Sequence, residues 1–282
     1  MRTHLAVQTM CESAAVSRAG FYRFRNQQKP ARPDAGLRDE IQRIALEWPR
    51  YGTRRITAEL RQRGWKVNRK RVRRLMREDN LLCLRKRKFV VTTNSQHPLA
   101  VYPNLTRSLV LTEVNQLWVA DITYIRLEEE FVYLAVILDA YSRRVIGWEL
   151  DRTLEDRLTL AALGMALAQR PVGVGLVHHS DRGMQYASGD YIQQLKEHGM
   201  EISMSRKASP WDNAACESFM KTLKYEEVYC SEYRDLAEAR LRIGEFLEKV
   251  YNQRRLHSAL GYLSPAEFER RRGGEQKAAR MA

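Results

Sequence analysis

The chain has 282 residues, of which 44% are hydrophobic and 29% are charged. This length allows one catalytic domain of ordinary size plus one or two small modules, with a core that needs no disulfide. The longest apolar run, Phe131 to Leu138, is too short to cross a bilayer, and the N-terminus has no continuous apolar stretch. We therefore expect neither a membrane protein nor a secreted one. The four cysteines have no paired spacing, which argues against a disulfide framework and a structural zinc site.

The net charge of +14 is concentrated in the N-terminal third of the chain. Residues 1–100 hold 24 Lys and Arg against 8 Asp and Glu, whereas residues 101–282 hold 24 against 26. Clustered cations gain free energy by releasing counterions from phosphates, so this third is expected to meet a polyanion. A basic face that serves only solubility is the alternative.

Two parts of the N-terminal third carry weak structural signals. Residues 1–36 predict a short helical segment in which two helices flank a turn, with Ser17 as a cap for the second helix. Residues 85–114 mix a basic run with Asn, Pro and Ser and show no sustained period, so they predict a basic linker.

Residues 37–84 predict a helix-turn-helix DNA-binding domain. Apolar residues recur at helical spacing in three stretches; Gly64 separates the second from the third, and Asn68 can cap the third. The cations that this third helix can lay against a duplex are Arg69, Lys70, Arg73, Arg74 and Arg77. A basic surface helix in an ordinary bundle is the alternative. Arg and Lys both read bases and grip phosphates, so the sequence leaves the mode of contact open.

From residue 115 the pattern changes to strands. Three segments rich in β-branched and aromatic residues, 117–125, 131–140 and 142–150, predict an antiparallel meander. The segments that follow are a helix near 154–169, a strand at 175–180, a helix near 187–197, a strand at 201–205 and a long helix from about residue 213. This order predicts an α/β layered domain over residues 115–270, followed by a charged, disordered tail over residues 271–282.

Three acids of this domain stand where a carboxylate is unusual. Asp121 interrupts an otherwise apolar strand, where a lone charge is costly and a bound cation would offset the cost. Asp181 follows the fourth strand, and Glu217 lies in the first turns of the long helix. Hard cations such as Mg²⁺ prefer oxygen ligands and are commonly held by one or two carboxylates each. Three acids can therefore hold two such ions for an in-line phosphoryl transfer.

The helix that carries Glu217 has further features. Asp212 or Asn213 can cap its N-terminus. Lys221 and Lys224 lie on nearly the same stripe of the helix as Glu217, and they are expected to hold the phosphate backbone beside the metals.

Three motifs in the second part of the chain resemble those of the integrase-core transposases, the bacterial relatives of retroviral integrases. The motifs are WVADITYI, HHSDRGMQY and SPWDNAACESFMKTLKYEEV. Their spacing agrees as well, since 59 residues lie between Asp121 and Asp181 and 35 between Asp181 and Glu217. YNQRRLHSALGYLSPAEFE and YGTRRITAELRQRG are similar to the closing segment and the accessory helix-turn-helix of insertion-sequence transposases. The resemblance covers roughly residues 37–270 and is nearest to the insertion-sequence-three family.

This resemblance implies an RNase H-like integrase core with Asp121, Asp181 and Glu217 as the DDE triad, loaded with two Mg²⁺ ions or with Mn²⁺ as a substitute. The implied enzyme is a transposase that cleaves the 3′ ends of an insertion sequence and transfers them into DNA by transesterification, without a nucleotide cofactor. A homo-oligomer on DNA is implied, as is an upstream-frame partner protein, because the chain corresponds to the catalytic second-frame product. The expected location is the bacterial cytoplasm, at the nucleoid.

Two other functions stay open at this point. A structure-specific nuclease would use the same acids to cut DNA but would never join it. A catalytically silent DNA-binding regulator would keep the basic helix and lose the chemistry.

Other residues near these motifs are expected to be structural. His178 and His179 are neighbours in a strand and face opposite ways, so at most one of them could reach a metal. Asp139 is expected to serve a local turn or a salt bridge. Packing or hydrogen bonding is the expected role of Trp118, Trp211, Asn252, Arg255 and His257.

Overall fold

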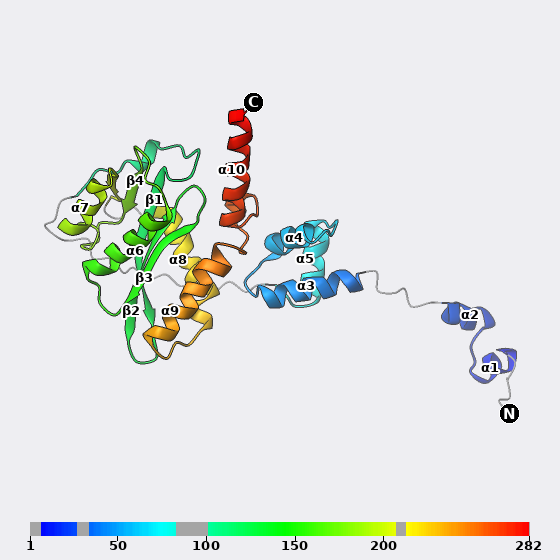
Figure 1. Cartoon of the computed structure of the whole chain (residues 1–282). Coiled ribbons are helices and arrows are strands. Elements are labelled where there is room, and N and C mark those ends of the chain that lie inside the picture. Colours follow the sequence, from blue (N-terminus) through cyan, green and yellow to red (C-terminus); the bar gives the residue numbers. More distant parts are fainter. Residues whose placement is uncertain (1–6, 27–33, 83–100, 207–212, 282) are drawn as a thin grey trace. The chain divides into compact units, whose positions relative to one another are not determined.

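The computed structural model describes residues 7–26, 34–82, 101–206 and 213–281 of the chain, which divides into two compact units, residues 1–84 and 85–282 (Figure 1). The expectations for Trp211, for Asp212 and for most of the basic linker lie outside the described residues. No helix among the described residues is long and apolar enough to cross a membrane.

The N-terminal unit begins with a pair of short helices. These are α1 (Val7–Ser13) and α2 (Arg18–Asn26). The Ser17 hydroxyl accepts a hydrogen bond from the Gly20 N–H at 3.0 Å, so the expected cap of the second helix is confirmed.

A three-helix domain follows, made of α3 (Ala35–Glu47), α4 (Thr53–Gln62) and α5 (Arg69–Glu78). Gly64 adopts a φ of +87° after α4, and the Asn68 side chain accepts the Lys70 N–H at 2.8 Å, which caps α5. The fully buried side chains of this domain come from all three helices, and they are Ile41, Ile44, Ile56, Leu60, Val72, Leu75 and Met76. The apolar spacing that predicted three helices is therefore confirmed.

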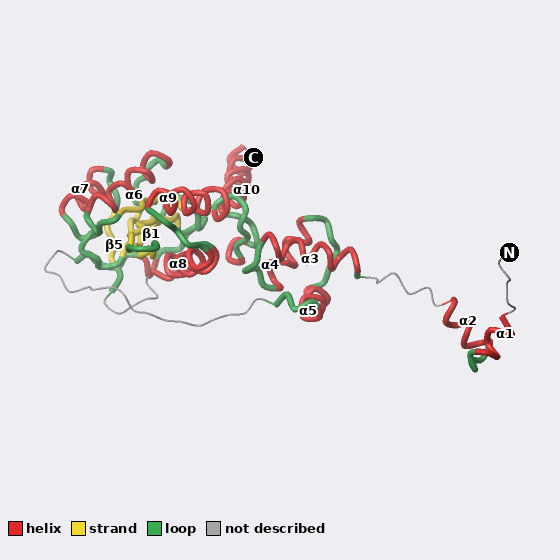
Figure 2. The backbone as a smooth tube through the Cα atoms, turned by 90° about the horizontal axis from the view of Figure 1, so that it is seen from below, coloured by secondary structure: helices red, strands yellow, loops and turns green. Residues whose placement is uncertain are grey.

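The second unit is built on a five-stranded sheet with the order β3-β2-β1-β4-β5. The strands are β1 (Leu117–Arg126), β2 (Phe131–Asp139), β3 (Val145–Asp151), β4 (Val177–Ser180) and β5 (Glu201–Met204). The first three form the expected antiparallel meander, and β4 pairs in parallel with both β1 and β5. Figure 2 shows the strands between helices.

The third strand begins later than the sequence predicts. Residues 142–144 belong to a turn instead, because the Asp139 carboxylate accepts the Ser142 N–H at 2.8 Å and the Asn115 N–H at 2.6 Å. Arg143 adopts a left-handed φ of +62° in this turn. The local turn role expected for Asp139 is confirmed, and burial raises the pKa of its carboxyl despite these hydrogen bonds.

Helices cover both faces of the sheet. α6 (Asp156–Gln169) and α7 (Gly189–Glu197) pack on one face, and α8 (Ala214–Glu226) and α9 (Leu236–Glu245) pack on the other (Figure 1). Alternate residues of β1 enter the two cores: Leu117 and Val119 join the core beneath α8, and Trp118 and Ala120 join the core beneath α6 and α7. Since Asp121 continues the first set, its side chain belongs to the face of α8.

Shorter elements complete the unit. They are the 3₁₀ helices η1 (Thr106–Ser108), η3 (Val228–Cys230) and η5 (Ser258–Leu260), and the π-helix η4 (Phe246–Tyr251). The last helix, α10 (Pro265–Met281), occupies the segment for which the sequence predicts a disordered tail. Its composition explains the difference, because Glu, Gln, Lys, Ala and Arg favour helices and the Arg271 guanidinium donates to Glu267 one turn earlier at 2.7 Å.

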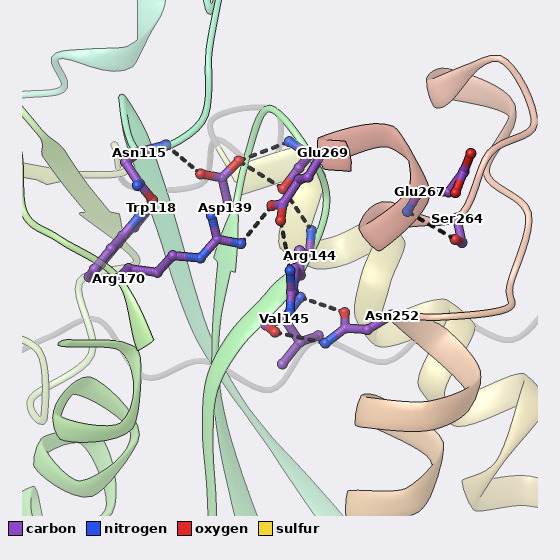
Figure 3. A network of polar contacts seen from close by, with 11 residues as sticks. Asn115, Trp118, Asp139, Arg144, Val145, Arg170, Asn252, Ser264, Glu267 and Glu269 are labelled. Atoms are coloured by element: carbon purple, nitrogen blue, oxygen red, sulfur yellow. Dashed lines mark hydrogen bonds and ion pairs between the residues drawn. The ribbon is translucent and has the colours of Figure 1, made fainter. Parts of the chain in front are cut away.

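A polar network fastens α10 and the end of η4 to the sheet (Figure 3). Glu269 of α10 accepts hydrogen bonds from Arg144 at 2.8 Å and from Arg170 at 2.6 Å. The Asn252 side-chain amide exchanges two hydrogen bonds with the backbone of Val145, at 3.0 and 2.9 Å. The structural role expected for Asn252 is therefore confirmed.

Arg255 fixes the helix α8 through an ion pair with Glu226. Its side chain is 3% exposed, and its guanidinium donates to both carboxylate oxygens of Glu226 at 2.6 and 2.7 Å. The same guanidinium lies 3.4 Å from a ring nitrogen of His257. Because Glu226 points away from Glu217 on α8, this buried pair fixes the helix without using the side that carries the candidate catalytic acid.

We expect Arg255→Ala to destabilise the protein strongly, because it leaves the Glu226 carboxylate, whose side chain is only 12% exposed, without its cation. Breaking a buried pair in this way costs about 3–5 kcal/mol, and in a domain of this size the Tm should fall by roughly 10 °C. Circular dichroism during heating measures the change. Arg234→Ala removes the ion pair with Glu238 from an arginine that is 79% exposed, and it should lower the Tm by at most a few degrees. Equal shifts in the two variants would contradict this role of Arg255.

Candidate active site and DNA-contacting helix

Asp121 and Asp181 lie on or directly after two neighbouring strands of the sheet. The parallel register pairs Leu117 with Val177 and Val119 with His179; Asp121 lies two residues further along β1, and Asp181 directly follows the end of β4 at Ser180. Residues two apart on a strand share a face, so the Asp121 carboxylate belongs to the face of α8. The charge of Asp181 acts on Asp121, so the two acids lie within electrostatic range of each other.

A tight turn fixes Asp181 at this position. Its Oδ1 accepts the Gly183 N–H at 2.9 Å, and a Cβ atom at Gly183 would lie only 2.9 Å from the same oxygen, which explains the glycine. Arg182 donates from Nε to the Ser205 carbonyl oxygen at 2.7 Å. This second bond ties the turn to the chain that follows β5.

Glu217 is placed by a contact between α8 and β1. Asn213, at the N-terminal end of α8, is buried, and its side-chain amide donates to the Ala120 carbonyl oxygen at 3.2 Å. The expected side-chain cap is not formed by Asn213, because its amide reaches the strand rather than the helix. The bond holds the first turn of α8, with Glu217, beside the residue that precedes Asp121.

The three acids act on one another electrostatically. Burial raises the pKa of Asp121 to about 7, and the charges of Asp181 and Glu217 contribute to the rise. The Ile122 N–H, which donates to Asp121 at 2.9 Å, and the charge of Lys224 oppose it. The expectation that a charge at Asp121 is costly is confirmed, and a cation between the acids would relieve that cost.

The acids do not form a closed set of metal ligands. Within the described ranges, no group of three or more His, Cys, Asp or Glu side chains is arranged to hold a metal ion. Glu217 is 41% exposed, and its carboxylate lies 3.8 Å from the Lys221 ammonium instead. The donors nevertheless fit a hard cation, because they are all carboxylate oxygens and the charges of Asp181 and Glu217 both act on Asp121.

The two lysines expected beside the acids lie in different surroundings. Lys224 is half-buried, and its ammonium lies 4.6 Å from the centre of the Tyr124 ring. Burial lowers the pKa of Lys224, while the charge of Asp121 raises it. Lys221 is 66% exposed and pairs with Glu217. Each lysine therefore places positive charge near a different acid, Lys221 near Glu217 and Lys224 near Asp121.

The two histidines before Asp181 are structural, as expected. His178 lies 2.9 Å from the Tyr191 hydroxyl, and burial lowers its pKa to about 3, so its ring is neutral. His179 places its two ring nitrogens 2.8 and 3.0 Å from the hydroxyls of Ser203 and Ser205. Both rings therefore pack and form hydrogen bonds inside the domain.

Tyr186 is a residue of this site to which the sequence assigns no role. Its ring packs edge-on against Tyr191, with centroids 5.4 Å apart, and its buried hydroxyl has no hydrogen-bond partner among the described residues. Burial and the charges of Tyr191, Asp121 and Asp181 raise the pKa of this hydroxyl. The one available signal is its place at the end of HHSDRGMQY, five residues after Asp181.

The basic helix α5 has three distinct faces. One face is the buried apolar stripe, and a second carries Arg71 and Arg74, which donate to Asp34 at 2.9 Å each. Arg74 also donates to Glu78 at 3.0 Å. The cations on the third face are exposed and form no ion pair with a described residue, and they are Arg69, Lys70, Arg73 and Arg77.

Comparisons with known proteins agree with this division of the chain. An HTH-like domain matches residues 32–89, and an integrase core domain matches residues 112–210 and 198–265. The chain is 41% identical over 263 residues to the insertion element IS600 uncharacterized 31 kDa protein of Shigella sonnei, which covers 92% of this chain and 97% of that protein. It is 35% identical over 274 residues to transposase InsF for insertion sequence IS3A of Escherichia coli (strain K12), with 95% of each covered.

Among solved structures, the HTLV-2 integrase catalytic core domain in complex with magnesium matches 56% of this chain and 97% of that chain. Its sequence identity is 16% and its TM-score is 0.41.

These observations define a transposase with an integrase core and an HTH-like DNA-binding domain. The chain belongs to the IS3 family of insertion-sequence transposases. The fold class, the enzyme class of DDE transposases and integrases, and the family that the motifs predict are thereby confirmed.

We expect Asp121→Asn to stabilise the protein in the absence of divalent ions, and to do so more at pH 8 than at pH 5. Because the pKa of Asp121 rises from 3.8 to about 7 on folding, its contribution to stability is present at low pH and is lost as the pH rises through 7. The lost contribution is of the order of a few kcal/mol, which corresponds to several degrees in Tm.

The measurement is thermal unfolding in EDTA at both pH values, repeated with Mg²⁺. Added Mg²⁺ should raise the Tm of the wild-type protein at pH 8 and should have a much smaller effect on the variant. A variant that is less stable than the wild type at pH 8 would show that the ionised Asp121 carboxylate does not destabilise the folded protein.

Proposed function

We propose that Asp121, Asp181 and Glu217 carry the metal-dependent cleavage of the 3′ ends of an insertion sequence and the transfer of those ends into target DNA. The observation that supports this most is the order of the strands, since Asp121 lies on β1 on the face covered by the helix of Glu217, and Asp181 directly follows β4, which pairs in parallel with β1. The pKa of Asp121, raised by burial and by both other acids, agrees with three carboxylates that share one small region.

Mg²⁺ is the proposed cofactor, with two ions per site and Mn²⁺ as a substitute, held by Asp121, Asp181 and Glu217. Such ions supply activation of the attacking oxygen and stabilisation of the leaving oxygen in an in-line displacement. Glu217 has to leave its ion pair with Lys221 to join the two aspartates. This exposed pair is worth at most about 1 kcal/mol, so the movement costs little and leaves Lys221 available for a phosphate.

Double-stranded DNA is the proposed substrate and partner. In the N-terminal unit, the proposed contacts to the duplex are the exposed cations on the third face of α5, which are Arg69, Lys70, Arg73 and Arg77. Arg74 is not among them, because it forms ion pairs with Asp34 and Glu78 within its own domain. In the catalytic unit, Lys221 and Lys224 are the proposed phosphate contacts. A homo-oligomer on DNA, an upstream-frame partner protein and a location at the nucleoid in the bacterial cytoplasm belong to the same proposal, and family membership supports them.

Asp181→Asn tests the proposed chemistry, since it removes one charge and keeps the size of the side chain. We expect it to abolish Mg²⁺- or Mn²⁺-dependent cleavage and joining of a DNA that carries the ends of the element, with DNA binding largely retained. Asp190→Asn changes an exposed acid on α7 in the same way and should retain activity.

A pre-cleaved DNA end separates the remaining functions. The transposase joins this end to target DNA, whereas a structure-specific nuclease cuts DNA and never joins it. Salt-dependent binding without any cutting, under every divalent ion and with the upstream partner added, would instead favour a silent regulator. Full activity of Asp181→Asn would exclude the proposed triad.

The faces of α5 give a second, independent test. We expect the double variant Arg73→Ala, Arg77→Ala to weaken binding to any duplex and to reduce the slope of log K against log salt by about 2, since each phosphate contact contributes about 0.9. The matched control is Arg71→Ala, Arg74→Ala, which removes two cations from the ion-paired face of the same helix. Fluorescence anisotropy over a salt series measures both. Equal losses in the two variants would show that net charge, and not one face of α5, binds the duplex.

A further inference from the structure

Exposed aromatic side chains gather at one place on the catalytic unit. Across the described residues of this unit, the aromatic side chains that are more than a third exposed are Tyr124 at 38%, Phe131 at 48% and Tyr229 at 64%. Tyr124 lies on β1 and Phe131 begins β2, and their ring centroids are 5.9 Å apart in an edge-to-face arrangement. Tyr229 lies in η3, directly after α8, and its ring packs edge-on against Tyr225 at 5.5 Å. Exposed apolar surface that is gathered in this way marks an interaction site.

Cations are interleaved with these rings. The Lys224 ammonium lies 4.6 Å from the centre of the Tyr124 ring, and the Arg126 guanidinium lies 5.4 Å from the centre of the Phe131 ring. Lys224 also leads to Tyr229, because the next residue of α8, Tyr225, packs edge-on against Tyr229 in η3. We call Tyr124, Arg126, Phe131, Lys224 and Tyr229 the aromatic patch.

The aromatic patch is linked to the acids through Lys224. Tyr124 and Asp121 are three residues apart on β1 and therefore point to opposite faces of the sheet, but the Lys224 ammonium contacts the Tyr124 ring while its charge acts on Asp121. A DNA strand whose phosphate is held by Lys224 beside the acids can therefore place its neighbouring bases at these rings. The mixture of flat apolar surface and positive charge complements the two parts of a nucleotide, the base and the phosphate.

We propose that the aromatic patch binds unpaired bases of the DNA strand next to the phosphate that is cut or joined, by stacking them on Tyr124, Phe131 and Tyr229. Bases inside a duplex have both faces covered by their neighbours, so the rings select DNA whose end is opened. Stacking is tolerant of sequence because every base has an aromatic face. The proposal rests on the proposed transposase site only for the position of that phosphate.

Photocrosslinking locates the contact directly. The full-length protein is mixed, in EDTA, with a single-stranded oligonucleotide that carries 5-iodouracil, irradiated and digested for mass spectrometry. We expect crosslinks at Tyr124, Phe131 or Tyr229. Crosslinks confined to other parts of the chain would overturn the proposal. Because EDTA prevents any metal-dependent reaction, failure of the proposed triad leaves this result unaffected.

Variants then measure the selectivity for unpaired bases. We expect Tyr124→Ala and Phe131→Ala each to lower the affinity for the single strand by roughly five- to one hundredfold, and to change the affinity for the same sequence as a blunt duplex by less than about twofold. Phe131→Leu keeps the apolar bulk without the ring and should behave like Phe131→Ala. Tyr124→Phe keeps the ring and should bind as the wild type does. Leu241→Ala, which removes a side chain that is 65% exposed on α9, serves as the control for exposed apolar surface elsewhere.

Three outcomes would overturn the proposal. Unchanged affinity for the single strand would show that the rings do not stack on bases. Equal losses on the single strand and the duplex would show a general contact rather than selection of opened ends. A change of oligomeric state in the alanine variants, measured by light scattering without DNA, would assign the patch to an interface between copies of this chain. Circular dichroism of each variant confirms that the fold is retained.

Discussion

The burial of Asp121 near a second acid is the constraint on which the arrangement of the catalytic unit depends. Burial makes a charge on Asp121 costly, and the charge of Asp181, which directly follows the neighbouring strand β4, adds to that cost. Such a site keeps its shape only if the backbone around it is held by other bonds. The Asn213 amide on the Ala120 carbonyl, the Gly183 N–H on Asp181 and the Arg182 guanidinium on the Ser205 carbonyl are those bonds. These bonds hold the backbone in place, and of the three acids they use only one oxygen of Asp181, which accepts the Gly183 N–H.

The helix α8 separates structural charge from charge that is available for chemistry. On one side, Glu226 is neutralised by Arg255 inside the protein. On the other side, Glu217 and Lys221 form a weak, exposed pair, and Lys224 is attracted by both Asp121 and the Tyr124 ring. A strong pair resists rearrangement and a weak one does not. The position of α8 is therefore held firmly, whereas the Glu217 side chain can change its partner at little cost.

Periodicity predicted most of the architecture, because the apolar residues that alternate along β1 or recur along α3, α4 and α5 enter the cores that the fold contains. The departures depend on contacts between residues distant in sequence or on local hydrogen bonds. The sequence predicts that Arg74 is available to DNA, but Asp34, 40 residues before it, pairs with it and with Arg71. Asp139 turns the chain before β3, and Asn213 reaches a strand rather than its own helix. The aromatic patch has no sequence signature, because its residues come from the β1–β2 hairpin and from the end of α8, which are far apart in the sequence.

The distribution of charge divides the work of binding DNA between the two units. Residues 101–282, which include the sheet and the acids of the catalytic unit, carry 24 cations against 26 acids, so this part of the chain gains little from counterion release over its whole surface. Residues 1–100, with 24 against 8, supply that attraction, and the third face of α5 directs it at a duplex. A nearly neutral catalytic unit can hold its substrate only by local contacts, through a few cations near the acids and through rings that need no net charge. Stacking depends weakly on salt, whereas phosphate contacts depend on it strongly, so rising salt should release the duplex from α5 before it releases an opened end from the catalytic unit.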